Sequence, residues 1–148
     1  MTYEQWDFIA DAYTPILIFI NLGLMGHFFR SKYWLKLQLG IMSLITTIPL
    51  VYISMWLDQV FSLWPAFNSD FSTHTALAYA LIWHWKDSNK RLAATGLMSL
   101  LMYFILMDFQ GYHTWLDMIS TLLAMTILFQ LVQPLLSFTM DQKKPDAI

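Results

Sequence analysis

The chain has no cysteine and little charge, and these two shortages exclude most classes of soluble protein. Without cysteine there is no disulfide, no thiolate nucleophile and no thiolate metal site, whereas the redox compartment stays open. Only 12% of the 148 residues are charged, 57% are hydrophobic, and the mean hydropathy is +0.50. Soluble domains carry about twice that share of charge. The composition therefore indicates an integral membrane protein.

Basic residues are also missing from long stretches of the sequence. None lies between Lys36 and Lys86, and no basic tract of the kind that binds nucleic acid is present, so we expect no nucleic-acid partner. Residues 1–12 carry Glu4, Asp7 and no basic residue. This start is unlike a cleaved signal peptide, and we expect it to form a short interfacial segment.

Long apolar runs predict an all-α integral membrane protein, a bundle of about five transmembrane helices. We expect a single domain over residues 1–148, with spans at residues 13–29, 33–57, 72–86, 92–108 and 113–138. Pro49 and Pro134 fall inside two of these spans, where proline is expected to kink a helix. The third run is short for a bilayer, so one of its ends is expected to be recessed.

The placement of the basic residues predicts the orientation in the membrane. In a five-span arrangement all eight fall on one side, in the first loop, the third loop or the C-terminal tail. They are Arg30, Lys32, Lys36, Lys86, Lys90, Arg91, Lys143 and Lys144. Because cytoplasmic loops are rich in Lys and Arg, we expect the N-terminus outside and the C-terminus in the cytoplasm. In a bacterial inner membrane, the acidic loops 58–71 and 108–112 would then face the periplasm or the exterior.

Two histidines stand at the starts of predicted helices on the outer side. His74 follows Ser72, a residue type that caps helices by accepting hydrogen bonds from their first N–H groups. His113 and Asp117 have the i, i+4 spacing that puts two side chains on one helix face. A carboxylate in that position can fix the tautomer of an imidazole and make its other nitrogen a better nucleophile or base. The sequence therefore predicts one catalytic site formed by His74, His113 and Asp117.

Other polar residues of the spans have simpler expected roles. His27 and His84 map to the cytoplasmic ends of their helices, where we expect them to cap the helix or to reach the membrane surface. Asn21 lies inside the first span and is expected to form an interhelical hydrogen bond or to bind a ligand.

The two histidine segments resemble motifs of a known superfamily. Phe71-Ser72-Thr73-His74-Thr75 is similar to the Phe-Ser-Gly-His-Thr segment of sphingomyelin synthases, and His113-x-x-x-Asp117 is similar to their His-x-x-x-Asp. The wider group is the superfamily of membrane-bound type 2 phosphatidic acid phosphatases. The likeness covers roughly the last half of the chain. It implies phosphoryl or phospho-head-group transfer at the outer surface of the membrane.

The resemblance also implies a role for each residue. His113 would attack phosphorus to give a phosphohistidine, Asp117 would orient it, and His74 would protonate the leaving oxygen. The expected substrate-binding residues are Ser72, Thr73, Tyr112 and Trp115. The preferred function is thus that of a membrane lipid phosphatase or phospho-head-group transferase that acts on lipids of the outer leaflet without a cofactor.

The basic residues that hold phosphate in that superfamily have no counterpart in this sequence. The Ser and Arg of its third motif would fall at Leu106 and Met107, and Thr73 stands where the family has glycine. The starts of the third and fifth predicted helices can instead aim free N–H groups and positive dipole ends at the site. Alternatively, a divalent metal such as zinc could supply the charge. Its candidate ligands are His74, His113, Asp70, Asp108 and Asp117.

Two alternative functions therefore stand beside the preferred one. A metal centre would make the protein a membrane hydrolase that cleaves a lipid ester or amide through a metal-bound water. The other alternative is a non-catalytic membrane subunit or ligand-binding protein whose polar helix ends contact a partner. In either case the chain could pair with copies of itself or with a larger membrane protein, although no motif requires this.

Overall fold

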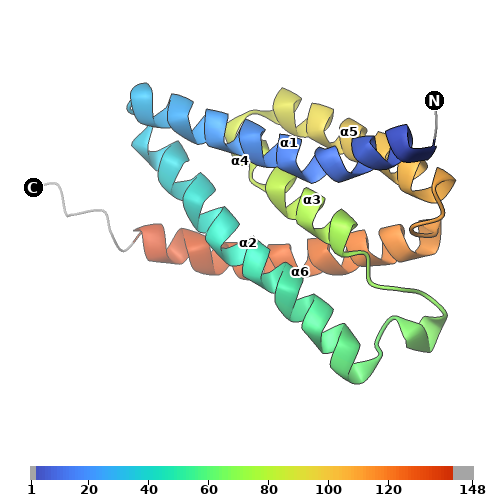
Figure 1. Ribbon diagram of the computed structural model, residues 1–148. Helices are drawn as coiled ribbons and strands as arrows, with labels where there is room; N and C mark the ends of the chain where they lie inside the picture. The colour runs from blue at the N-terminus through green and yellow to red at the C-terminus, as the bar shows by residue number, and fades with distance from the viewer. Residues whose placement is uncertain (1–2, 142–148) are drawn as a thin grey trace, which may run out of the picture.

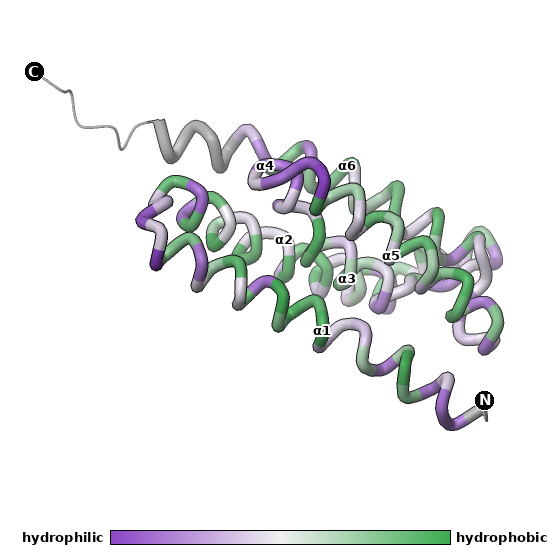
Figure 2. Tube along the Cα trace, turned by 90° about the horizontal axis from the view of Figure 1, so that it is seen from above, coloured by the Kyte–Doolittle hydropathy of each residue, from purple (hydrophilic) through white to green (hydrophobic). Residues whose placement is uncertain are grey.

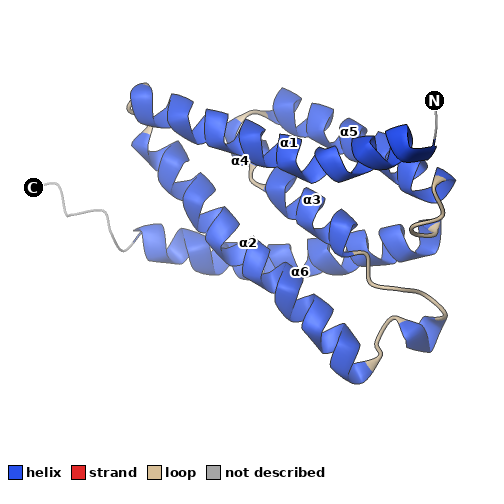
Figure 3. Cartoon of the chain, in the orientation of Figure 1, coloured by secondary structure: helices blue, strands red, loops and turns tan. Residues whose placement is uncertain are grey.

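The computed structural model describes the backbone of residues 3–141 and the side chains of residues 4–134. In this part of the chain helices joined by loops are the regular structure, and there is no strand (Figure 3). Its elements are α1 (Tyr3–Arg30), α2 (Trp34–Phe61), the 3-10 turn η1 (Pro65–Phe67), α3 (Thr73–Trp83), α4 (Trp85–Ser88), α5 (Lys90–Phe109) and α6 (Trp115–Asp141). The predicted all-α fold is confirmed.

Four of these helices are long and apolar enough to cross a membrane. The qualifying segments are Glu4–Arg30, Trp34–Phe61, Lys90–Phe109 and Trp115–Pro134. At most 33% of the apolar stretch of each is buried inside the protein, so most of its apolar side chains face outward. Figure 2 shows hydrophobic residues along the helices and hydrophilic ones gathered towards their ends. Such an outer surface suits lipid, and the chain has the helices of an integral membrane protein, as predicted.

The short helix α3 lies in the middle of the bundle and packs against α1, α2, α5 and α6 (Figure 1). Its 11 residues span about 16 Å, roughly half the thickness of a hydrocarbon core. Ala76, Ala78 and Ala80 are completely buried, and their small side chains let the neighbouring helices approach closely. The predicted third span, residues 72–86, is therefore α3 followed by the short α4, and neither is among the four helices long enough to cross a membrane.

The first helix begins earlier than predicted. Residues 3–12, expected to form a separate interfacial segment, are continuous with the first span in α1. The reason is that Ala10 and Leu17, two turns apart on one face, both pack into the core and are only 4% and 2% exposed. Pro15, Pro49 and Pro134 lie inside α1, α2 and α6, and none of these helices ends at its proline.

A buried polar cluster ties α1 to the junction of α3 and α4. The Asn21 amide nitrogen donates to the carbonyl oxygens of Leu17 (2.8 Å) and Leu81 (3.1 Å). The Asn21 side-chain oxygen accepts from the Trp85 indole N–H (3.1 Å) and is hydrogen-bonded to His84 Nε2. The interhelical bond predicted for Asn21 is confirmed. His84 stands at the junction of the two helices, but its ring is 2% exposed and does not reach the surface, because α3 ends inside the bundle.

Helix α5 packs closely against the α3–α4 junction at Gly96, and a substitution at Gly96 tests this packing. A Cβ at Gly96 would lie 2.8 Å from the Trp85 ring and 2.9 Å from Ile82 Cγ2, and both side chains are buried. We expect Gly96→Ala to lower the free energy of unfolding by about 1–3 kcal/mol, seen as a lower Tm in detergent micelles.

Gly23→Ala is the matched control, because a Cβ at Gly23 would meet nothing within 4 Å. Alanine also favours helix more than glycine does, so the Tm of this variant should stay the same or rise. An unchanged Tm for Gly96→Ala would contradict the tight packing of α5 on the junction.

Candidate functional site

The two predicted histidines approach each other at the end of the bundle that holds the N-terminus (Figure 1). His74 is in the first turn of α3, and His113 lies in the loop between α5 and α6. Their ring centroids are 6.2 Å apart, and the ring planes meet at 58°. The His74 side chain is exposed, whereas that of His113 is 16% exposed. Two segments far apart in the sequence thus meet, as the sequence predicted.

Ser72 positions His74 by starting α3. Its hydroxyl oxygen accepts from the backbone N–H of Thr75 (3.3 Å) and is hydrogen-bonded to the Thr75 hydroxyl (2.9 Å). Its backbone N–H donates to the hydroxyl of Thr121 on α6 (3.0 Å). Ser72 is completely buried. It was predicted to bind substrate, but the structure places it beneath the site, where it caps the helix.

Asp117 fastens the loop before α3 to the start of α6. One carboxylate oxygen accepts from the Ser69 hydroxyl (2.7 Å) and the Asp70 backbone N–H (2.8 Å), and the other accepts from the Thr114 N–H (2.7 Å). The Thr114 hydroxyl in turn accepts from the Asp117 N–H (3.3 Å), which completes the reciprocal pair of a capping box. Asp117 is 5% exposed. Its carboxylate is therefore a joint between the two segments that carry the histidines.

His113 and Asp117 are close without being hydrogen-bonded. His113 Nδ1 lies 3.9 Å from an Asp117 carboxylate oxygen, beyond hydrogen-bond distance and within the range of a charge interaction. Burial lowers the pKa of His113 from its ordinary value of 6.5 and outweighs the opposite effect of the Asp117 carboxylate. The imidazole is therefore neutral near pH 7. A neutral ring keeps the lone pair that a nucleophile or a general base needs.

A cavity of about 230 Å³ lies between α1 and α3, with His74 in its wall. Thr73 lines it from α3, and Asp11 and Thr14 line it from α1. Asp11 was missed because residues 1–12 were assigned to an interfacial segment apart from the bundle. The signal that could have found it is a carboxylate close to an apolar run, which in membrane helices commonly faces the protein interior.

The other predicted residues have contacts or exposure of their own. The Tyr112 hydroxyl donates to the Asp7 carboxylate, which ties the α5–α6 loop to α1. Trp115 packs edge-on against Phe104, with ring centroids 6.3 Å apart. Asp108 is exposed at the end of α5 and, among the described side chains, forms no ion pair with either histidine.

The five candidate metal ligands do not form one coordination sphere. Among the side chains of residues 4–134, no three His, Asp or Glu groups stand in a position to hold a metal ion together. Asp70 donates its backbone N–H to Asp117, while its own carboxylate is exposed. Asp117 uses both of its carboxylate oxygens for hydrogen bonds. A metal at this site would require these side chains to move together, and the metal alternative stays a prediction.

The hydrogen bonds of Asp117 predict that its replacement affects the fold. In Asp117→Asn the amide nitrogen, itself a donor, would face the Thr114 N–H or the Ser69 and Asp70 donors and leave a buried polar group unpaired. We expect a loss of about 3 kcal/mol in the free energy of unfolding and faster hydrogen exchange at the Asp70 and Thr114 amides. Asp108→Asn is the control, and its exposed side chain should change neither. An Asp117→Asn variant as stable as the wild type would contradict the joint.

Comparison with known proteins yields no relative for this chain. No family profile matches it, and neither does any curated protein or solved structure. The likeness of its two short motifs to the type 2 phosphatidic acid phosphatase superfamily therefore stays a resemblance of sequence segments.

Proposed function

We propose that the chain is a membrane lipid phosphatase or phospho-head-group transferase in which His113 and His74 act as a pair. The observation that carries this proposal is the 6.2 Å approach of the two rings at the starts of two helices. A nitrogen of neutral His113 attacks phosphorus, the bond to the leaving oxygen breaks, and protonated His74 gives its proton to that oxygen. Water or an acceptor hydroxyl then attacks the phosphohistidine, while His74 takes the proton back.

The charge around the site indicates which phosphates suit it. The described Lys and Arg side chains lie at the end of α1, the start of α2, α4 and the start of α5, away from the histidines. Positive potential at the site comes from the first N–H groups of α3 and α6 that the capping hydroxyls of Ser72 and Thr114 leave free, and the Asp117 carboxylate in the first turn of α6 offsets part of it. The carboxylates of Asp11 and Asp70 lie nearby. Weak positive potential beside two carboxylates favours a phosphodiester, which has one negative charge, over a doubly charged phosphate monoester. It therefore favours head-group transfer over removal of a terminal phosphate.

The proposal includes a position in the membrane. If α3 and α4 together count as a crossing, the chain has five spans, with its N-terminus outside and its C-terminus inside. The support is that the described basic side chains are all placed away from the histidine site, and basic residues favour the cytoplasmic side. In a bacterial inner membrane the site would face the periplasm.

Head-group or phosphate release from a panel of phospholipids and lipid phosphates tests the chemistry. We expect His113→Gln and His74→Gln each to reduce release by about a hundredfold or more, since each removes one proton-transfer or nucleophilic group. His27→Gln is the matched control, because His27 is exposed at the opposite end of α1. Each reaction is run with and without a strong chelator, and the wild-type rate should survive chelation.

Three results would contradict the proposal. Release that persists in His113→Gln would exclude this residue as the nucleophile. Release that stops with the chelator would favour the metal-dependent hydrolase instead. No head-group or phosphate release from any lipid of the panel would favour a non-catalytic membrane subunit.

The lowered pKa of His113 predicts the acid side of the pH profile. The proposed nucleophile is inactive when protonated, and burial favours its neutral form, so the midpoint of the acid-side fall in kcat/KM should lie below pH 6.5. The Asp70 carboxylate raises this pKa. Asp70→Asn should therefore move the acid limb to still lower pH. An acid limb at or above pH 6.5, or a shift to higher pH in the variant, would contradict the assignment of His113.

A further inference from the structure

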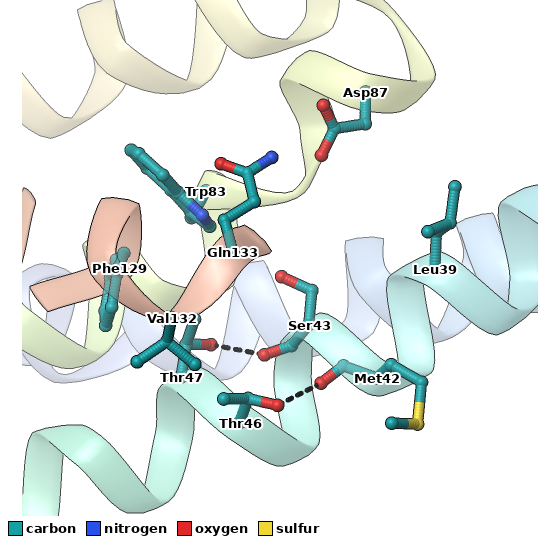
Figure 4. A pocket seen from close by; sticks show the side chains of 10 residues that line it. All are labelled: Leu39, Met42, Ser43, Thr46, Thr47, Trp83, Asp87, Phe129, Val132 and Gln133. Carbon is teal, nitrogen blue, oxygen red and sulfur yellow. Dashed lines mark hydrogen bonds between the residues drawn. The ribbon is translucent and has the colours of Figure 1, made fainter. Parts of the chain in front are cut away.

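A second cavity lies away from the histidines, between α2, α6 and the α3–α4 junction (Figure 4). Its volume is about 220 Å³. Pockets for drug-sized ligands begin at about 300 Å³, so this cavity suits a small chemical group. Its wall combines the hydroxyls of Ser43, Thr46 and Thr47 on α2 with the ring of Trp83 and the carboxylate of Asp87. Nothing in the proposed histidine chemistry uses it.

The threonine hydroxyls of this wall are acceptors for a ligand. The Thr46 hydroxyl donates to the carbonyl oxygen of Met42 (2.7 Å), and the Thr47 hydroxyl donates to that of Ser43 (2.8 Å), as the dashed lines in Figure 4 mark. A hydroxyl has one proton and two lone pairs. With that proton directed at its own helix, each oxygen has only lone pairs left for the cavity. These two threonine oxygens therefore favour a group with several N–H or O–H donors.

Charges of both signs lie on or beside residues that line the cavity. The Asp87 side chain is exposed there. The Lys86 ammonium lies 3.3 Å from the centroid of the Trp83 ring and donates to the side-chain oxygen of Gln133 (2.8 Å). The Lys36 ammonium donates to the carbonyl oxygen of Ser88, the residue after Asp87 (3.4 Å). One carboxylate next to two ammonium groups matches a ligand that carries a positive and a negative charge close together.

We propose that this cavity binds the head group of an ethanolamine-type phospholipid. The primary ammonium is directed to Asp87 and the threonine oxygens, and the phosphate is directed to Lys86 and Lys36. A primary ammonium has three N–H donors, whereas the quaternary ammonium of choline has none, so the acceptor wall distinguishes the two lipids. Exposed apolar side chains of α2 and α6 offer a surface for the acyl chains; they include Ile41, Ile45, Ile127 and Leu131.

Titration of the purified full-length chain with short-chain lipids tests this site. Native mass spectrometry in detergent counts bound phosphatidylethanolamine, phosphatidylcholine and phosphatidylglycerol. We expect the ethanolamine lipid to bind about tenfold more tightly than either of the others, the difference of one charge-assisted hydrogen bond. Asp87→Asn should weaken binding of the ethanolamine lipid, and the double variant Thr46→Val, Thr47→Val should abolish its preference over the choline lipid.

Matched controls keep the test specific. Asp108→Asn removes an exposed carboxylate from the end of α5, and Thr95→Val removes a threonine on α5 that bonds its own helix in the same way as Thr46 does (3.1 Å). Both should bind the lipids as the wild type does. Because Asp87 is exposed, Asp87→Asn should not disturb the fold, which its Tm will verify.

Several outcomes would overturn the proposal. Equal affinity for the ethanolamine and choline lipids would exclude the acceptor wall as the selecting feature. Binding that is unchanged in Asp87→Asn would exclude the carboxylate. Competition by free ethanolamine at the same concentration as the lipid would assign the cavity to a water-soluble amine. None of these results bears on the histidine chemistry, which is tested by head-group release.

Discussion

Hydrogen bonds to one buried carboxylate hold together the two segments that carry the histidines. Asp117 joins Ser69 and Asp70, just before α3, to Thr114 at the start of α6. The connection lets the histidines meet although the chain between them runs to the opposite end of the bundle and returns (Figure 1). Side chains that position a site in this way are as sensitive to replacement as the groups that react, and loss of activity alone does not separate the two roles.

At the centre of the bundle Asn21 pairs several buried polar groups, although His84 Nδ1 in the same cluster is buried without a hydrogen-bond partner among the described residues. Asn21 uses its amide and its oxygen to bind the backbone of α3 and the rings of His84 and Trp85. In a membrane no water is available to replace such partners, so the cluster fixes how α1 lies against the α3–α4 junction. The small residues of α3 and Gly96 of α5 then allow the surrounding helices to close on this short helix.

The helices and the meeting of His74 with His113 could be predicted, because apolar run length and the alternation of spans are properties of the sequence itself. The hydrogen-bond partners of each polar residue could not be predicted from the sequence. The i, i+4 spacing predicts that Asp117 and His113 share one helix face. It gives no indication that Ser69 and Asp70 donate hydrogen bonds to an Asp117 carboxylate oxygen. Asp11 was missed because only the packing of α1 against α3 brings it to His74. The burial of His84 depends on where α3 ends inside the bundle, which hydropathy does not determine.

The shortness of α3 has an electrical consequence. A cavity lies beside its first turn, where His74 stands, and another lies at its end, where Trp83 stands. If water fills both, the dry, low-dielectric path between them is about 16 Å long, against about 30 Å in an unperturbed bilayer. The membrane voltage then falls over roughly half the usual distance, and the local field is about twice as strong. A charge or proton that moves a given distance along this path would cross a larger share of the membrane potential than it would over the same distance in the surrounding lipid.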